Sequence, residues 1–303
     1  MRYKLDDIAT FVQAVEAGSL SAAARRLGLS KSVVSKRVGD LEAALGAALL
    51  QRTPRRVVPT DAGTAYYQRA RAILAELDHA AEAAAGPTGA LRGSLRIAAP
   101  MSFGQVHLGP ALFPLAQRHP ELELAIDLDD RFVDLVGEGY DLGIRIGRLA
   151  DSTLVARKLT TSRILLCASP DYLARAGTPR TIDDLAGHAH IGYANRPAAT
   201  LPMADGPMRP LGRPRLLVNN GELAREAALA GLGLAVLPSF IAAEALRAGR
   251  LVPVLCQAPL AHAAVSAILP PTRHRSAKVR AVLDHLAACW RDPPPWEDGL
   301  GLG

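Results

Sequence analysis

The sequence predicts an α/β protein in three consecutive parts: a small helical unit, one long helix, and a larger region of alternating strands and helices. Apolar residues recur at helical spacing over residues 5–45, broken only at glycines. A second helical pattern runs without interruption over 61–85. From about residue 91, short apolar runs alternate with helical segments, which is typical of a mostly parallel sheet with helices on both faces.

The helical unit contains three short helices separated by glycine turns at Gly18 and Gly28 and ended by Gly46. Ser30 is placed to cap the third helix, and the small pair Ala23 and Ala24 allows the second helix to approach its neighbours closely. Two short helices joined by a glycine turn form a helix-turn-helix. The apolar face of the third helix is formed by Val34, Val38, Leu41 and Leu45.

Charge is concentrated in the same unit. Residues 1–60 contain ten Lys and Arg against five Asp and Glu, whereas the net charge of all 303 residues is +6. Cations and short hydroxyl side chains gather at the start of the third helix, which is the end that such motifs insert into the major groove of DNA. A small helical bundle with a solvated charged face is the alternative interpretation.

A basic hairpin follows the third helix. Leu49 and Leu50 and then Val57 and Val58 predict two short strands around the turn at 53–56, which forms a wing that can contact phosphates or a minor groove. Thr60 or Asp61 can cap the long helix, which carries one apolar stripe and therefore needs a partner helix, so we interpret it as a dimerisation helix. The stripe comprises Tyr66, Ala70, Ile73, Leu77, Ala81 and Ala84.

We divide the candidate DNA contacts by residue type. The candidates for base edges are Lys31, Ser32, Val33 and Lys36. Ser35, Arg37, Arg52 and Thr53 are better suited to phosphates, and Arg55 and Arg56 lie at the tip of the wing.

Four quoted segments, in this order, resemble the LysR-type transcriptional regulators along essentially the whole chain. They are "SLSAAARRLGLSKSVVSKRVGDLEAALG", "LLQRTPRRVVPTDAG", "GSLRIAAP" and "GLGLAVLP". The segment "EGYDLGIRIG", followed by "STLVARKL" and "LLCASPDYL", is similar to one large subgroup. Many members carry Gln-Pro where this chain has Lys31-Ser32, and a lysine favours guanine or phosphate contacts, so base preference cannot be copied from relatives.

The resemblance implies a winged helix-turn-helix over 1–60, a linker helix over 61–88, and a periplasmic-binding-protein-like effector domain over 91–303. In such domains the chain crosses twice between lobes, here near 160–163 and 263–268, giving lobe I at 91–161 and 268–291 and lobe II at 162–267. It also implies a homo-oligomer built as a dimer of dimers, an interrupted palindrome in double-stranded DNA, a small-molecule effector, and RNA polymerase as a candidate partner. An effector-independent architectural DNA-binding protein is the alternative.

The effector is expected between the lobes, where strand ends face a crevice. Met101, Ser102 and Phe103 begin a helix, and Asn219 and Asn220 stand at a second helix start. Arg145, beside Gly147, is either a ligand-pairing cation or a surface group, and Tyr193 is a candidate for the opposite wall. Two helix N-termini that face one cleft favour an anion, so we expect an organic acid or an amino-acid-like effector.

Enzymatic and membrane functions are not indicated. The chain has no G-x-S-x-G, H-E-x-x-H or P-loop motif, and "GLG" at 231–233 lacks the sequel of a dinucleotide site, so we expect no catalysis, cofactor or metal. Its three cysteines show no zinc or disulfide spacing, and its first residues show no signal-peptide pattern. Together these two observations predict a cytoplasmic protein. The apolar run 227–243 predicts helix, turn, buried strand and helix start, not a membrane span, and residues 292–303 predict a disordered tail.

Overall fold

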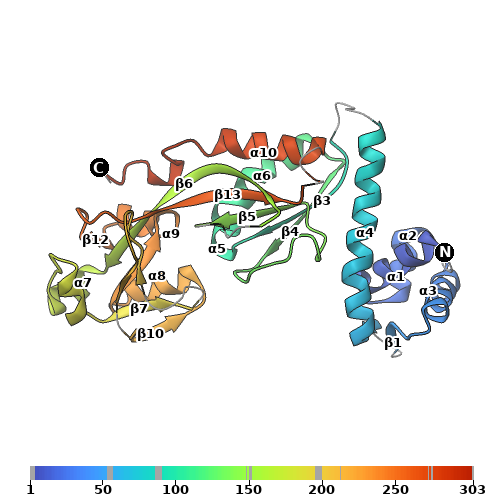
Figure 1. Cartoon of the computed structure of the whole chain (residues 1–303), viewed down its shortest axis with the longest axis horizontal. Coiled ribbons are helices and arrows are strands. Elements are labelled where there is room, and N and C mark those ends of the chain that lie inside the picture. Colours follow the sequence, from blue (N-terminus) through green and yellow to red (C-terminus); the bar gives the residue numbers. More distant parts are fainter. Residues whose placement is uncertain are drawn as a thin grey trace. The chain divides into compact units, whose positions relative to one another are not determined.

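The computed structural model describes residues 4–52, 57–85, 91–147, 149, 152–194, 200–211, 213–271, 273 and 276–301 (Figure 1). The chain forms two compact units, one of residues 1–88 with 133–140 and one of residues 89–132 with 141–303. No helix in the described ranges combines the length and hydropathy that a membrane span requires.

The first unit begins with the predicted helices: α1 (Leu5–Ala17), α2 (Leu20–Leu27) and α3 (Lys31–Leu45). Gly18, Gly28 and Gly46 end them in the left-handed conformation that glycine adopts at little cost. The three helices bury one shared apolar core, whose centre is Phe11, Val34 and Leu41. The helix-turn-helix is therefore stabilised by this core and leaves the opposite face of α3 to solvent.

The wing is present as β1 (Leu50–Arg52) paired antiparallel with β2 (Val57–Pro59). Thr60, not Asp61, caps α4 (Asp61–Ala85), because its hydroxyl accepts the N–H of Gly63 at 2.9 Å. The apolar stripe of α4 divides along its length. Tyr66 and Ala70 pack on the core of the same unit, whereas Ile73 and Leu77 are 58 % and 45 % exposed. In the alternating region, the segment "FVDLVGEG" at 132–139 predicts a short helix, but residues 132–134 have no regular structure and 135–139 form turns, so that prediction is wrong.

The second unit is built on one sheet in which β6 (Val155–Ala168) changes partners along its length. Residues 155–163 pair with β13 (His262–Leu269), and residues 164–168 pair with β11 (Leu234–Pro238) and β12 (Val252–Val254). The change falls between Arg163 and Ile164, at the first predicted crossing between lobes. We call this point, between Arg163 and Ile164, the hinge.

On one side of the hinge the strand order is β6-β13-β5-β3-β4, with β3 (Gly93–Ala99), β4 (Leu122–Leu128) and β5 (Leu142–Ile146) parallel to one another. Helices α5 (Met101–Phe103), η1 (Gly104–Leu108), α6 (Gly109–Arg118) and α10 (Ala277–Cys289) pack beside these strands (Figure 1). We call this part lobe I. Its parallel strands end at one edge, which brings the residues after each strand together.

On the other side the order is β6-β11-β7-β10, with β7 (His190–Tyr193) and β10 (Leu216–Val218) parallel to β11. Helices α8 (Gly221–Leu229) and α9 (Ser239–Arg247) pack on this part, which we call lobe II, and α8, β11 and α9 form the predicted helix, strand and helix of the apolar run. The remaining elements of the lobe are α7 (Pro170–Ala176), η2 (Asp183–Gly187), β8 (Thr200–Leu201) and β9 (Arg209–Pro210).

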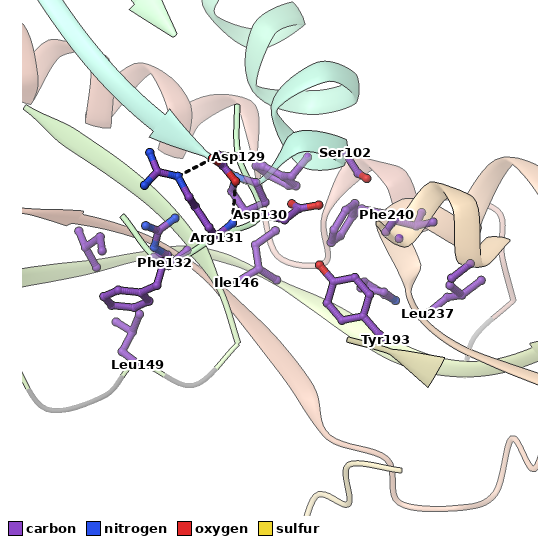
Figure 2. Close-up of a pocket in the computed structure, with 18 of the residues that line it drawn as sticks. Ser102, Asp129, Asp130, Arg131, Phe132, Ile146, Leu149, Tyr193, Leu237 and Phe240 are labelled. Carbon is purple, nitrogen blue, oxygen red and sulfur yellow. Dashed lines mark hydrogen bonds and ion pairs between the residues drawn. The ribbon is translucent and has the colours of Figure 1, made fainter. Parts of the chain in front are cut away.

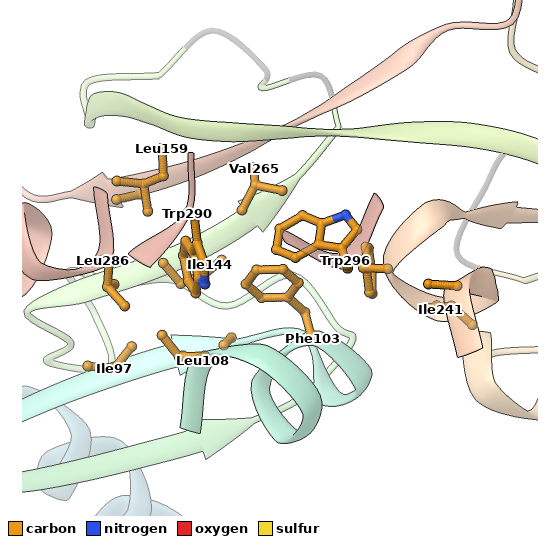
Figure 3. Packing of buried hydrophobic residues seen from close by; sticks show 14 of the residues in the cluster. Ile97, Phe103, Leu108, Ile144, Leu159, Ile241, Val265, Leu286, Trp290 and Trp296 are labelled. Carbon is orange, nitrogen blue, oxygen red and sulfur yellow. The ribbon is translucent and has the colours of Figure 1, made fainter. Parts of the chain in front are cut away.

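The C-terminal residues do not form the predicted disordered tail. Residues 290–301 follow α10 and include the short helix η4 (Pro295–Glu297), and Trp290 and Trp296 are each only 5 % exposed. Phe103, fully buried, lies between the two tryptophans (Figure 3). The prediction failed because Trp296, within the proline- and glycine-rich segment, is buried against Phe103, and burial of a large aromatic side chain stabilises the order of the segment.

Candidate nucleic-acid interface and effector cavity

The start of α3 presents an exposed polar surface. The hydroxyl of Ser30 accepts the N–H of Val33 at 3.3 Å and so caps the helix, as predicted. Lys31, Ser32 and Lys36 are exposed, and Val33 leaves 39 % of its surface in solvent although it is a large apolar residue. An apolar group among hydrogen-bonding groups can contact a thymine methyl, and the others can contact base edges.

Arg37 lies differently from the other basic residues of α3. Its guanidinium donates to the Asp6 carboxylate at 3.2 Å and to the Thr10 hydroxyl at 3.3 Å, both on α1. Ser35 is half-buried. Arg52 belongs to β1, and Thr53, Arg55 and Arg56 lie outside the described residues. The structure therefore brings the base-edge candidates together on one face, whereas Arg37 links α3 to α1.

Glu42 has a role that the sequence analysis missed. One oxygen of its carboxylate accepts the backbone N–H groups of Leu49 and Leu50, at 2.8 and 3.0 Å. These bonds fix the start of the wing relative to the end of α3. No sequence signal distinguishes Glu42 from an ordinary solvated helix residue.

A cavity of about 990 Å³ lies between lobe I and lobe II (Figure 2). Residues at the carboxyl ends of β3, β4 and β5 line one side, and residues of β7, β11, α8 and α9 line the other. Most of the lining is apolar, and its polar groups are few, as in sites for small organic molecules. The lining includes Ser102, Phe103, Asp129, Asp130, Arg131, Phe132, Arg145, Tyr193, Gly221 and Phe240.

Ser102 and Gly221 both line this cavity and lie close to each other. Ser102 is 5 % exposed, and within the described part of the chain its hydroxyl has no hydrogen-bond partner. A Cβ on Gly221 would lie 3.9 Å from that hydroxyl and 2.4 Å from Ile241 Cδ1, so a larger residue there would displace the end of the Ile241 side chain. Gly221 is the first residue of α8, whose N-terminus carries a partial positive charge. The Ser102 hydroxyl and this helix end together form a polar corner suited to an acid group.

The start of α5, in contrast, is already occupied. Asp130 Oδ1 accepts the N–H of Met101 at 2.9 Å, which places a carboxylate next to Ser102. Figure 2 shows Asp130, Ser102 and Tyr193 around the same part of the cavity. A bound molecule would therefore meet a negative charge beside the polar corner, which favours a hydrogen-bond donor or a positive group at that point.

A second group of charges lines the cavity near the loop after β4. The Asp129 carboxylate accepts from Arg131 Nε at 2.6 Å, and the Arg145 guanidinium stands 5.2 Å from the ring centre of Phe132. The backbone N–H of Arg131, followed by its side chain and the charge of Arg145, lowers the pKa of Asp129. Arg145 thus lines the cavity, and its role as a ligand-pairing cation stays a prediction.

The remaining predicted effector residues are distributed unevenly. Phe103 and Tyr193 line the cavity. The lining does not include Met101, which is 45 % exposed, or Gly147 and Asn219. Asn220 is also outside the lining, and its side chain caps α8 by accepting the N–H of Leu223 at 3.0 Å. Asp130 and Gly221 also line the cavity, although neither was predicted from the sequence. In the described ranges, no three or more His, Cys, Asp or Glu side chains are grouped to hold a metal ion.

A winged helix-turn-helix unit together with a two-lobed α/β unit enclosing a cavity defines a class of protein that binds DNA and a small molecule. Comparison with known families agrees. Residues 5–64 match the bacterial regulatory helix-turn-helix domain of the lysR family, and residues 88–290 match the LysR substrate binding domain. The chain belongs to the LysR family of transcriptional regulators, which are not enzymes, and its second unit is the effector-binding domain of that family.

Similar proteins span almost the whole chain. The transcriptional regulator DmlR of Escherichia coli K12 is 35 % identical over 286 residues, covering 93 % of each chain. The structure of CrgA from Neisseria meningitidis is 31 % identical with a TM-score of 0.60 and covers 93 % of this chain and 97 % of that one. The full-length structure of AphB, a Vibrio cholerae virulence activator, is 26 % identical with a TM-score of 0.59, covering 94 % and 99 %.

Proposed function

We propose that this regulator recognises specific DNA sequences through the α3 reading face (Lys31, Ser32, Val33 and Lys36). The observation that carries the proposal is the capped, solvent-exposed start of α3, where cations, a hydroxyl and one apolar group are presented together. Ser35, Arg52, Thr53 and the wing residues Arg55 and Arg56 are proposed phosphate contacts. Arg37 is a proposed positioning residue, because its guanidinium is bonded to α1.

The oligomer we propose is a dimer of dimers acting on an interrupted palindrome, because a two-fold symmetric protein reads two inverted half-sites. Ile73 and Leu77 of α4 supply an exposed apolar surface for the first dimer contact. Contact with RNA polymerase and action in the cytoplasm belong to the same proposal.

Selection from random DNA tests sequence recognition. The purified protein is incubated with duplexes that contain a randomised central region, and bound duplexes are sequenced over several rounds. Two inverted half-sites with a fixed spacing are expected. Recovery without sequence enrichment would instead support the effector-independent architectural protein.

The effector, we propose, is an amino-acid-like molecule that carries both an acid group and an amino group. The acid group would meet the Ser102 hydroxyl and the N-terminus of α8, and the amino group would meet the Asp130 carboxylate. These three features adjoin one another, as the two charged groups of an α-amino acid do. The predominantly apolar remainder of the cavity would accept the side chain.

Thermal unfolding with matched ligands tests this proposal. The set comprises L-leucine and L-phenylalanine, the corresponding acids without an amino group (4-methylpentanoate and 3-phenylpropanoate), and the corresponding amines without an acid group. A ligand at a hundred times its Kd stabilises the folded state by roughly 2.7 kcal/mol, a readily measured shift. We expect an amino acid to stabilise the protein more than the corresponding acid or the corresponding amine does. Stabilisation by the amines alone would overturn the proposal.

A further inference from the structure

The C-terminal segment, residues 290–301, contacts the hinge, both lobes and the wall of the cavity. Trp296 contacts lobe I through Phe103 and His107, with ring centres 5.7 and 4.6 Å away, and lobe II through Phe240 at 6.3 Å. Phe103 and Phe240 both line the cavity. Figure 3 shows Trp296 beside Phe103 at the centre of the buried cluster. One side chain of this segment therefore supports the cavity wall from both lobes.

Glu297 attaches the same segment to the hinge. Its side chain is 7 % exposed, and its Oε1 accepts the backbone N–H of Arg163 at 3.0 Å and the Ser239 hydroxyl at 2.6 Å. Its second oxygen is 3.4 Å from Arg163 Nε. Arg163 is the last residue of β6 that pairs with β13, so this buried carboxylate is bonded at the point where β6 changes partners.

Ser239 connects these contacts into one network. Its hydroxyl has a single proton, which is donated to Glu297, and it accepts from Trp296 Nε1 at 3.2 Å. The Ser162 hydroxyl, 2.8 Å away, must then be a donor to Ser239. Each of these bonds involves the segment, β6 or the start of α9, so loss of one member would remove hydrogen bonds from the others at a buried position.

Further bonds fix both ends of the segment. Near its start, the Thr160 hydroxyl donates to the Arg291 carbonyl at 3.0 Å, and the Thr161 hydroxyl donates to Asp292 at 3.1 Å. Near its end, Arg247 of α9 donates to the carbonyls of Trp296 and Asp298, at 2.7 and 3.1 Å. The segment therefore crosses the hinge while bonded on each side of it.

We propose that residues 290–301 form a strap that sets the angle between lobe I and lobe II, with Trp296 and Glu297 as positioning residues of the cavity. Phe103 and Phe240, which line the cavity, both rest on Trp296, so closure of the lobes on a small molecule requires the strap to adjust. The proposal concerns the effector-binding domain and holds whatever effector or DNA sequence the protein recognises.

Distance measurement between two spin labels tests the strap. Labels are attached to cysteines introduced at the exposed positions Gln117 in lobe I and Ala174 in lobe II, in the full chain carrying Cys256→Ser and Cys289→Ser. Cys167 is buried and stays. Labelled protein is diluted with unlabelled protein, so that only distances within one chain are measured. A single narrow distance is expected without any added ligand.

Glu297→Ala is expected to shift or broaden that distance, and Glu297→Gln, which keeps an acceptor for Ser239 and Arg163, is expected to restore much of it. Glu244→Ala is the matched control, since Glu244 is an exposed acid of α9 that pairs only with Arg250 in the described contacts. Far-UV circular dichroism verifies folding, and a chain ended after Pro294 replaces Glu297→Ala if that variant does not fold. A distance unchanged in Glu297→Ala or in the shortened chain would overturn the proposal.

Discussion

The carboxylate of Asp130 accepts the backbone N–H of Met101 at 2.9 Å and thereby caps the helix that carries Ser102 into the effector cavity. This bond places a negative charge next to the group that we assign to the acid end of the effector. We propose that this charge selects an amino-acid-like molecule over a simple organic acid.

Asp130→Asn keeps an acceptor for Met101 but removes the charge. We expect the affinity for the amino acid that stabilises the wild type most to fall about tenfold, which corresponds to roughly 1.4 kcal/mol. The affinity for the matching acid without an amino group should fall less or rise. Isothermal titration calorimetry measures both, and Asp127→Asn is the control because Asp127 lies on β4 outside the lining. Equal losses for both ligands would contradict the assignment.

Gly63 is required by the close approach of α4 to the wing. A Cβ at this position would lie 1.9 Å from the carbonyl oxygen of Leu49, which is backbone and cannot move aside. Gly63→Ala should lower the free energy of unfolding by about 1–3 kcal/mol and weaken DNA binding with it. Gly187→Ala is the control, because its added Cβ meets no atom within 4 Å. Urea denaturation compares the two, and equal stability would show that α4 can shift.

The exposed Ile73 and Leu77 on α4 predict the dimer contact. Replacing both by Lys should convert dimers into monomers, because like charges would meet where apolar side chains pack. Sedimentation velocity measures the change. Arg69→Ala and Glu76→Ala, at exposed positions of the same helix, serve as controls. A dimer that survives the double replacement would place the subunit contact elsewhere.

His107 predicts a pH dependence of stability. Burial lowers the pKa of His107. The hydrogen bond between its ring and the Phe240 carbonyl raises the pKa by less, so the net direction is downward. The unfolded chain, with a histidine pKa near 6.5, therefore binds more protons than the folded chain just below that pH. The stability that goes with neutral, buried His107 is therefore fully present above about pH 6.5. It is lost as the pH falls towards the pKa of His107 in the folded chain.

Urea denaturation at about pH 7.5 and about pH 5.5 measures this loss, which should be smaller in His107→Phe than in wild type. His262→Gln, at an exposed position, should behave as wild type. An equal loss in His107→Phe and wild type would show that other groups control the dependence.

Local signals in the sequence predicted the helix-turn-helix well. Gly18, Ser30 and Gly46 act on the backbone within a few residues of themselves, and each occupies the cap position expected for it. The alternation of strands and helices similarly predicted the lobes' elements and the edge where residues such as Ser102 and Arg145 face the cavity.

Contacts between distant residues were not predictable in this way. Asp130 caps a helix 29 positions earlier, and Glu297 bonds to Arg163 across 134 positions. The segment 292–303 has the composition of a disordered tail, and only the apolar surface formed by Phe103 and Phe240 gives Trp296 a place to be buried. Arg37 likewise carries the charge of a phosphate contact, and only the folded position of Asp6 shows its second role.

The central claim, that the start of α3 reads DNA sequence, is tested most directly by recovery of sheared genomic DNA with purified protein. Wild type, Lys31→Ala and Lys158→Ala are compared, and Lys158 is an exposed lysine of β6 in the other unit. A base contact contributes about 1–3 kcal/mol of discrimination, so Lys31→Ala should lose or change the sharp peaks that wild type and Lys158→Ala share. Identical peaks in all three proteins, or uniform recovery of fragments by wild type, would contradict the account.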